Sequence, residues 1–250
     1  TAVKMMELAT NDGVNKKDLI ATAKEITMMR RLKHRNICGF YGCCYDSEEK
    51  VLCLFMELVT GGTLSSIIKR FKPLPENVLR IWTRQLITGL DYLHENKIMH
   101  RDIKGENVLV DLGKDSLKEQ DDQIKLADFG AAKRLSDAMS KGQTVVGTPY
   151  WMAPEVLSSE DGYSFPADVW SLGCTIAEMI TGRPPWPTRP NVPAAILMIA
   201  STTGPPSDLP TEADGVPAGC VDLMRKCLAK DPAERWTTAQ LLEHPWIKEE

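Results

Sequence analysis

A short run near the middle of the chain brings an acid, a cation and an amide close together. It extends from His100 to Asn107 and has the sequence HRDIKGEN. Asp102 is a carboxylate that can accept a proton, and the Lys104 ammonium can offset negative charge that develops nearby. Asn107 and the later Asp128 offer amide and carboxylate oxygens, which Mg²⁺ prefers as ligands. These residue types suit a reaction in which a proton is removed and negative charge develops beside a bound Mg²⁺ ion.

Short apolar runs predict the strands that position these side chains. Residues 107–110 and 123–127 are strand-like, so Asn107 and Asp128 are expected at neighbouring strand ends. Val51 to Met56 is a continuous apolar run, which indicates another, buried strand.

Helical periodicity dominates the later part of the chain. Residues 17–32 are predicted to form an amphipathic helix, and Val169 to Ile180 a helix that is apolar nearly all round and therefore central. A further helical stripe consists of Leu79, Trp82, Leu86, Leu90 and Leu93. The turn Thr60-Gly61-Gly62 is the expected hinge between two lobes. Strands with one helix, followed mostly by helices, predict an α+β fold.

Charge and composition narrow the class of partner. The net charge of −4 argues against general nucleic-acid binding. No apolar run approaches the roughly 18 residues of a membrane span and no signal segment opens the sequence, so we expect a soluble, cytoplasmic protein.

The seven cysteines include no C-x-x-C pair and are expected to pack as reduced apolar residues. The adjacent Cys43 and Cys44 leave a metal or redox site open, although no histidine stands nearby at ligand spacing.

The order of three short motifs gives a resemblance to a known family. The run HRDIKGEN is followed by Asp128-Phe129-Gly130 and then by Ala153-Pro154-Glu155, which is the protein kinase order. One such triplet alone is weak evidence for the family, but three in this order are strong evidence. The likeness extends from Ala2 to about Trp246. The chain therefore resembles a Ser/Thr protein kinase catalytic domain.

The resemblance implies the two-lobed protein-kinase fold. Residues 1–59 would be a partial, β-rich N-lobe, and residues 60–250 the helical C-lobe with the catalytic loop and activation segment. The family has a glycine-rich loop ahead of its lysine-bearing strand, and no G-x-G-x-x-G occurs in this sequence. We therefore expect a piece of a longer protein, without the first strands of the small lobe.

For the C-lobe, the resemblance implies ATP and Mg²⁺ chemistry. Asp102 would accept or orient the proton of the incoming hydroxyl, and Lys104 would offset charge on the moving γ-phosphoryl group. Asn107 and Asp128 would hold Mg²⁺. A lysine at position 104 is typical of Ser/Thr rather than Tyr kinases, as is the run GTPYWM over 147–152.

The N-lobe residues would bind the nucleotide. Ala2-Val3-Lys4 resembles the V-A-I-K strand, so Lys4 would hold the ATP α- and β-phosphates. Glu25 would be its partner, the alternative being an ordinary solvated glutamate. The residues expected around the adenine are Met56 as gatekeeper, the backbones of Glu57 and Val59, and the side chains of Ala2 and Leu109.

Other polar residues are expected to support the site. His100 would be a packing residue, Asp168 would fix the backbone around His100 and Arg101, and Glu155 and Arg235 would form a buried ion pair.

A regulatory segment is also implied. Residues 131–153 would be the activation loop, with Thr144 as the phosphosite of an upstream activating kinase. Its phosphate would pair with Arg101, with Lys133 as a second candidate partner, and order the loop. Ser140 and Thr148 are weaker candidates.

The subfamily is indicated by longer runs. His100 to Asn107 and Gly147 to Glu155 resemble the sterile-type kinases, and DVWSLGCT over 168–175 with GRPPW over 182–186 is most similar to MAP kinase kinase kinases. The substrate would then be a MAP kinase kinase. A p21-activated-like kinase and a non-catalytic pseudokinase scaffold stay open as alternatives.

Overall fold

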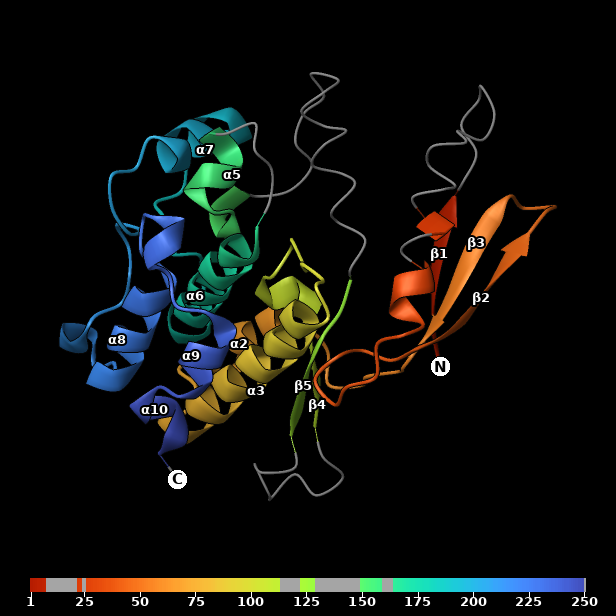
Figure 1. Cartoon of the computed structure of the whole chain (residues 1–250), viewed down its shortest axis with the longest axis horizontal. Helices are drawn as coiled ribbons and strands as arrows, with labels where there is room; N and C mark the ends of the chain where they lie inside the picture. Colours follow the sequence, from red (N-terminus) through yellow and green to blue (C-terminus); the bar gives the residue numbers. More distant parts are fainter. Residues whose placement is uncertain (8–21, 24–25, 113–121, 129–148, 159–163, 250) are drawn as a thin grey trace.

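The computed structural model describes residues 1–7, 22–23, 26–112, 122–128, 149–158 and 164–249, and the statements below concern these residues. A small sheet with a short helical segment lies on one side of the molecule, and a larger helical part lies on the other (Figure 1). A pair of strands lies between them. This arrangement agrees with the predicted α+β fold; the boundary expected between residues 59 and 60 stays a prediction.

The small part is a three-stranded antiparallel sheet of β1 (Ala2–Glu7), β2 (Phe40–Asp46) and β3 (Val51–Met56), in the order β1-β3-β2. β3 occupies the predicted range and is central because it pairs with both β1 and β2, and its Leu52 and Leu54 are buried as predicted. Alternate residues of a strand point to opposite faces, so Cys53 belongs to the other face.

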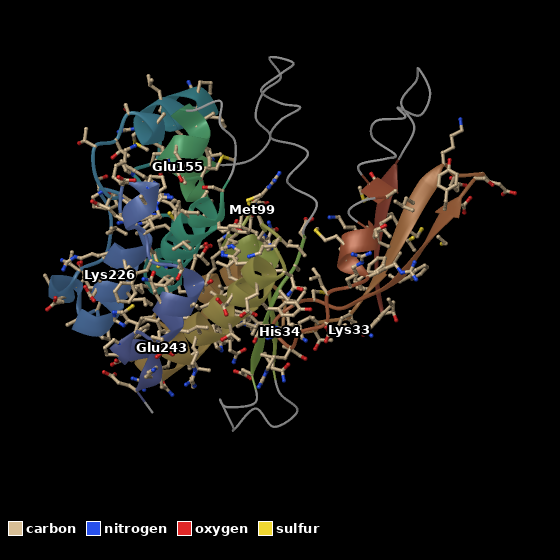
Figure 2. All side chains as sticks on the ribbon, viewed as in Figure 1. Lys33, His34, Met99, Glu155, Lys226 and Glu243 are labelled. Atoms are coloured by element: carbon tan, nitrogen blue, oxygen red, sulfur yellow. The ribbon has the colours of Figure 1, made fainter. Side chains whose placement is uncertain are left out.

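The segment after the helical residues 26–29 connects the sheet to the larger part. Lys33 and His34 lie on this crossing (Figure 2), and the His34 ring stacks on Tyr92 with centroids 4.8 Å apart. The Asn36 amide donates to the Ile124 carbonyl at 2.9 Å, and the Cys38 N–H donates to the Leu126 carbonyl at 2.9 Å. These bonds join the crossing to the strand pair.

The predicted hinge leads directly into the helical part. A Cβ atom on Gly61 would lie 2.2 Å from the Val110 carbonyl oxygen, so only glycine allows this close approach of two backbones. The Thr63 hydroxyl then accepts from the Ser66 N–H at 3.2 Å and caps α2 (Leu64–Phe71).

Two helices form the centre of the larger part. α3 (Glu76–Glu95) contains the predicted leucine and tryptophan stripe, which is buried. α6 (Phe165–Thr181) contains the predicted apolar helix and ends at Gly182, whose φ of 74° is left-handed. Around them lie α5 (Pro154–Ser158), α7 (Val192–Ala200), α8 (Ala218–Cys227), α9 (Thr238–Leu242) and α10 (Pro245–Lys248). Short 3₁₀ turns are formed by Gly105–Asn107, Pro149–Trp151, Glu212–Asp214 and Pro232–Glu234.

The strand pair consists of β4 (Val108–Asp111) and β5 (Gln123–Leu126), which are antiparallel. β4 begins and ends one residue later than predicted, and β5 ends one residue earlier. Asn107 lies in the preceding 3₁₀ turn because its side chain bonds back to Asp102, and Ala127 follows the end of β5. Both residues still lie where the two strands meet.

Part of the predicted helix over 17–32 lies outside the described residues; residues 22–23 and 26–29 are helical. Within the ranges given above, no helix combines the length and apolar character that a membrane crossing requires.

Candidate active site

The side chains of the central run converge on one carboxylate. The Lys104 ammonium lies 3.0 Å from Asp102 Oδ2. The Asn107 amide nitrogen donates to the same oxygen at 2.6 Å and to the Asp102 carbonyl at 2.8 Å. Asp102 is part-exposed, with 26% of its side chain accessible, so the carboxylate can meet an incoming group while its neighbours fix its orientation.

A buried carboxylate on α6 holds the start of this loop. Asp168 accepts from the backbone N–H of His100 at 2.9 Å and of Arg101 at 2.8 Å. Arg101 has a φ of 71°, a left-handed conformation that is unfavourable for arginine and that these two bonds stabilise. The expectation for Asp168 is therefore confirmed.

His100 is fully buried and joins the loop to the end of β5. Its Nδ1 accepts from the Asp102 N–H at 3.3 Å, so Nε2 carries the proton and donates to the Ala127 carbonyl at 3.2 Å. Burial lowers the pKa of His100, which agrees with this neutral tautomer. His100 is thus structural, as predicted.

Asp128 lies beside the loop and forms an ion pair with the small sheet. Its Oδ1 is 2.7 Å from the Lys4 ammonium, and its φ of 60° turns the chain at this point. The Ala127 N–H donates to the Asn107 carbonyl at 2.9 Å, which brings Asn107 and Asp128 together. Glu25, the predicted partner of Lys4, lies outside the described residues, so that pairing stays a prediction.

The residues expected around the adenine lie where the sheet meets the hinge. Ala2 pairs with Met56 across β1 and β3, and Leu109 on β4 forms a bridge with Thr63 just after the hinge. Val59 is half-buried on the hinge. The structure thus places Ala2 beside Met56 and Leu109 beside Thr63, while the contact of these residues with adenine stays a prediction.

The Glu57 side chain forms an ion pair with Lys125, which the sequence did not indicate. It accepts from the Gly39 N–H at 3.0 Å and lies 3.1 Å from the Lys125 ammonium. Lys125 is buried and also donates to the Arg35 carbonyl at 2.9 Å. These contacts join the residue that follows β3 to β5. The Glu57 N–H also donates to the Gly39 carbonyl at 2.8 Å. The Glu57 carbonyl, which accepts from the Cys38 thiol at 3.9 Å, keeps a second lone pair for the proposed adenine edge.

Glu178 is the largest omission of the sequence-based site. This buried carboxylate on α6 accepts from the Gly105 N–H at 3.0 Å, from Trp151 Nε1 at 3.0 Å and from the Ser65 hydroxyl. It joins the central loop, α2 and the segment before α5 at one point. A charged residue inside an otherwise apolar helix was the available sign of such a role.

We expect Glu178→Leu to lower the free energy of unfolding by about 1–3 kcal/mol, because three donors would lose their acceptor in a buried place. Glu178→Gln keeps one acceptor oxygen and an amide that can donate to Ser65, so its loss should be clearly smaller. Urea unfolding of both variants measures the difference. Equal losses would contradict a role based on hydrogen bonding.

The oxygen donors at the strand ends suit Mg²⁺. The two hydrogen bonds found for the Asn107 side chain use its amide nitrogen, so the amide oxygen is the atom suited to a cation. The Asp128 carboxylate is the second donor. An amide and a carboxylate fit an ion that takes its other ligands from phosphates and water. When bound, Mg²⁺ would neutralise phosphate charge.

A sheet-rich lobe and a helical lobe, with the candidate site where they meet, define the protein kinase fold. The family model described as "Protein kinase domain" matches residues 1–247. The chain belongs to this family. The crystal structure of Rad53 1-466 in complex with AMP-PNP has a TM-score of 0.75 and 26% identity, covering 98% of this chain and 57% of that chain.

The particular group is indicated by sequence relatives. Mitogen-activated protein kinase kinase kinase ANP1 of Arabidopsis thaliana is 41% identical over 98% of this chain and 35% of its own length. Mitogen-activated protein kinase kinase kinase 19 of Mus musculus is 42% identical over 99% of this chain and 18% of its own length. The chain thus spans about a third or less of these relatives, and the predicted resemblance to MAP kinase kinase kinases is confirmed.

Part of the expected activation segment lies outside the described residues. Phe129, Gly130 and the candidate phosphosites Ser140, Thr144 and Thr148 lie outside the described residues, so an upstream kinase acting at Thr144 stays a prediction. Residues 149–153, the end of the expected activation segment, are among the described residues. Here the Tyr150 hydroxyl accepts from the Arg189 N–H at 2.8 Å.

Proposed function

We propose that this protein is a Ser/Thr protein kinase that transfers the γ-phosphoryl group of ATP to a protein substrate with Mg²⁺. The carrying observation is the convergence of Asp102 and Lys104 with the Asp128–Lys4 ion pair, at 3.0 and 2.7 Å, where the two lobes meet. A base, a cation near it and a second acid–cation pair are the groups that in-line phosphoryl transfer needs.

In this proposal the nucleotide is bound by the small lobe and the hinge. The backbones of Glu57 and Val59 meet the adenine edge, and Ala2 and Leu109 pack against the ring. Lys4 turns from Asp128 to the α- and β-phosphates, which frees the Asp128 carboxylate for the cation. Asn107 supplies the other protein oxygen for the cation.

The transfer step uses the central loop. Asp102 accepts the proton of the substrate hydroxyl while that oxygen forms a bond to the γ-phosphorus. The bond from the γ-phosphorus to the bridging oxygen breaks, and ADP keeps the electron pair. Lys104 offsets negative charge on the moving group. The neighbouring bonds to Asn107 and Lys104 keep Asp102 oriented for this step.

We further propose that the substrate is a MAP kinase kinase, phosphorylated on serine or threonine. The support is the similarity to relatives that are named MAP kinase kinase kinases, at about 40% identity over nearly the whole chain. These relatives favour this reading over a p21-activated-like kinase.

We expect the full-length protein, given Mg-ATP, to label a catalytically inactive MAP kinase kinase on serine or threonine with negligible phosphotyrosine. Its kcat/KM should exceed that for a generic basic protein by about tenfold or more, the size of a modest difference in contact energy. Phosphoamino-acid analysis and initial rates measure both results. Dominant phosphotyrosine, or no transfer at all, would contradict the proposal. The Asp128→Asn variant controls for a contaminating kinase.

A further inference from the structure

Three of the seven cysteines lie on the small sheet, away from the site described above. Cys43 and Cys44 on β2 are exposed, and Cys53 on β3 is half-buried. All seven cysteines lie within the described residues, and all are free thiols. The other four are buried: Cys38, Cys174, Cys220 and Cys227.

Cys44 and Cys53 lie directly opposite each other in the antiparallel pairing of β2 and β3. Directly opposite residues have Cα atoms roughly 4.5–5.5 Å apart, and a disulfide spans about 4.4–6.8 Å between Cα atoms. Both side chains are on the face away from the buried Leu52 and Leu54. The expected Cα separation of the pair therefore lies within the range that a disulfide spans.

The two thiols already interact. Partial desolvation, the nearby Cys44 sulfur, a side-chain hydrogen bond with Cys44 and the Asp46 carboxylate together raise the pKa of Cys53. A hydrogen bond that favours the protonated form makes Cys53 the donor and the Cys44 sulfur the acceptor. Cys44 is the more exposed of the two thiols, so it meets an oxidant from solvent first, with Cys53 beside it to react next.

We propose that Cys44 and Cys53 are a reversible redox pair that a peroxide converts into a disulfide across β2 and β3. The Cys44 thiolate attacks one peroxide oxygen, the O–O bond breaks, and Cys44 becomes a sulfenic acid while hydroxide leaves and takes a proton. The Cys53 sulfur then attacks the Cys44 sulfur, forms the S–S bond and expels water. The two sulfurs are oxidised by two electrons in total, and the peroxide is reduced.

The environments of the other thiols make this pair selective. Burial raises the pKa of Cys38 to about 11 and of Cys220 to about 12, and it also raises those of Cys174 and Cys227. Thiolates react with peroxide and protonated thiols hardly do, so these four stay inert. Cys43 is exposed, but its partner across the sheet is Leu54, so it has no opposite thiol on β3.

The location gives the disulfide a consequence for the small lobe. Cys53 lies opposite Met5 on its other side, and Met5 follows Lys4 on β1. β3 also ends at Met56, from which the chain runs on to the hinge. A bond between β2 and β3 therefore fixes the strand that supports both Lys4 and the hinge.

The test treats the reduced full-length protein with hydrogen peroxide and then alkylates the remaining thiols. Peptide mapping without reductant should show loss of alkylation at Cys44 and Cys53 together, with one peptide cross-link between them that dithiothreitol removes. The Cys43→Ser variant is the matched control, because it removes the adjacent exposed thiol and should give the same cross-link.

The single variants distinguish the pair from ordinary surface oxidation. In Cys53→Ser, Cys44 should be trapped as the sulfenic acid, which a dimedone probe labels, with loss of the intramolecular cross-link. The proposal is overturned if both thiols stay alkylatable after peroxide, if the cross-link forms through Cys43, or if wild type and Cys53→Ser give the same oxidation products.

Discussion

Replacement of Asp102 by asparagine should lower turnover by about 10²–10⁴-fold, the usual contribution of a positioned general base. The change keeps the size of the side chain and an oxygen that can accept from Asn107 and Lys104, so the loop should keep its conformation. It removes the atom that can accept a proton. Because the base acts on the acceptor hydroxyl, the Kd for Mg-ATP should change little. Initial rates and nucleotide titration of the full-length variant measure the two quantities.

A surface aspartate provides the control for this result. Asp208 lies on a loop of the larger lobe, where it accepts from the Ser207 hydroxyl at 3.0 Å. Asp208→Asn makes the same chemical change and should leave the rate unchanged. If Asp102→Asn kept near-normal turnover, the proposed base would be wrong. If the affinity of Asp102→Asn for Mg-ATP fell by the same factor as its turnover, Asp102 would instead act in nucleotide binding.

Local pattern was sufficient for the elements that position the site. β3 and the core of α6 were predictable because a continuous apolar run or an all-apolar helix has few alternatives. The start of β4 was displaced from residue 107 to residue 108 since the Asn107 side chain bonds to Asp102. Hydrophobic periodicity does not reveal where a side-chain hydrogen bond competes with the backbone hydrogen bonds of a strand.

Three unpredicted contacts of the site join distant parts of the chain. Lys4 and Asp128 are 124 residues apart, and Glu178 and Gly105 are 73 apart. Motif order indicated that Lys4 and Asp128 belong to one site, yet it could not give their direct ion pair. The hinge contact of Glu57 with Lys125 likewise depends on how the crossing segment packs on β5. Only the folded arrangement determines which donors a buried carboxylate meets.

Arg235 supports the larger lobe, and the predicted pair with Glu155 is confirmed. Its guanidinium makes two bonds to the Glu155 carboxylate, at 2.6 and 2.8 Å, and its side chain is fully buried. Glu155 lies on α5 (Figure 2), directly after the described end of the expected activation segment. The guanidinium also lies over the Trp170 ring on α6, 4.9 Å from its centroid.

Arg235→Ala should therefore lower the free energy of unfolding by about 3–5 kcal/mol, the cost of leaving one partner of a buried pair alone. Three backbone carbonyls would also lose their donor: those of Ala229, Pro166 and Lys230. Arg235→Lys keeps the charge but cannot make the paired bonds, so it should be intermediate. Arg80→Ala is the matched control: it removes a pair to the exposed Glu249 at 3.1 Å and should cost at most about 1 kcal/mol. Urea unfolding of the three variants orders them. Equal losses for Arg235→Ala and Arg80→Ala would mean that the buried pair contributes no more than a surface contact, and that α5 is held mainly by apolar packing.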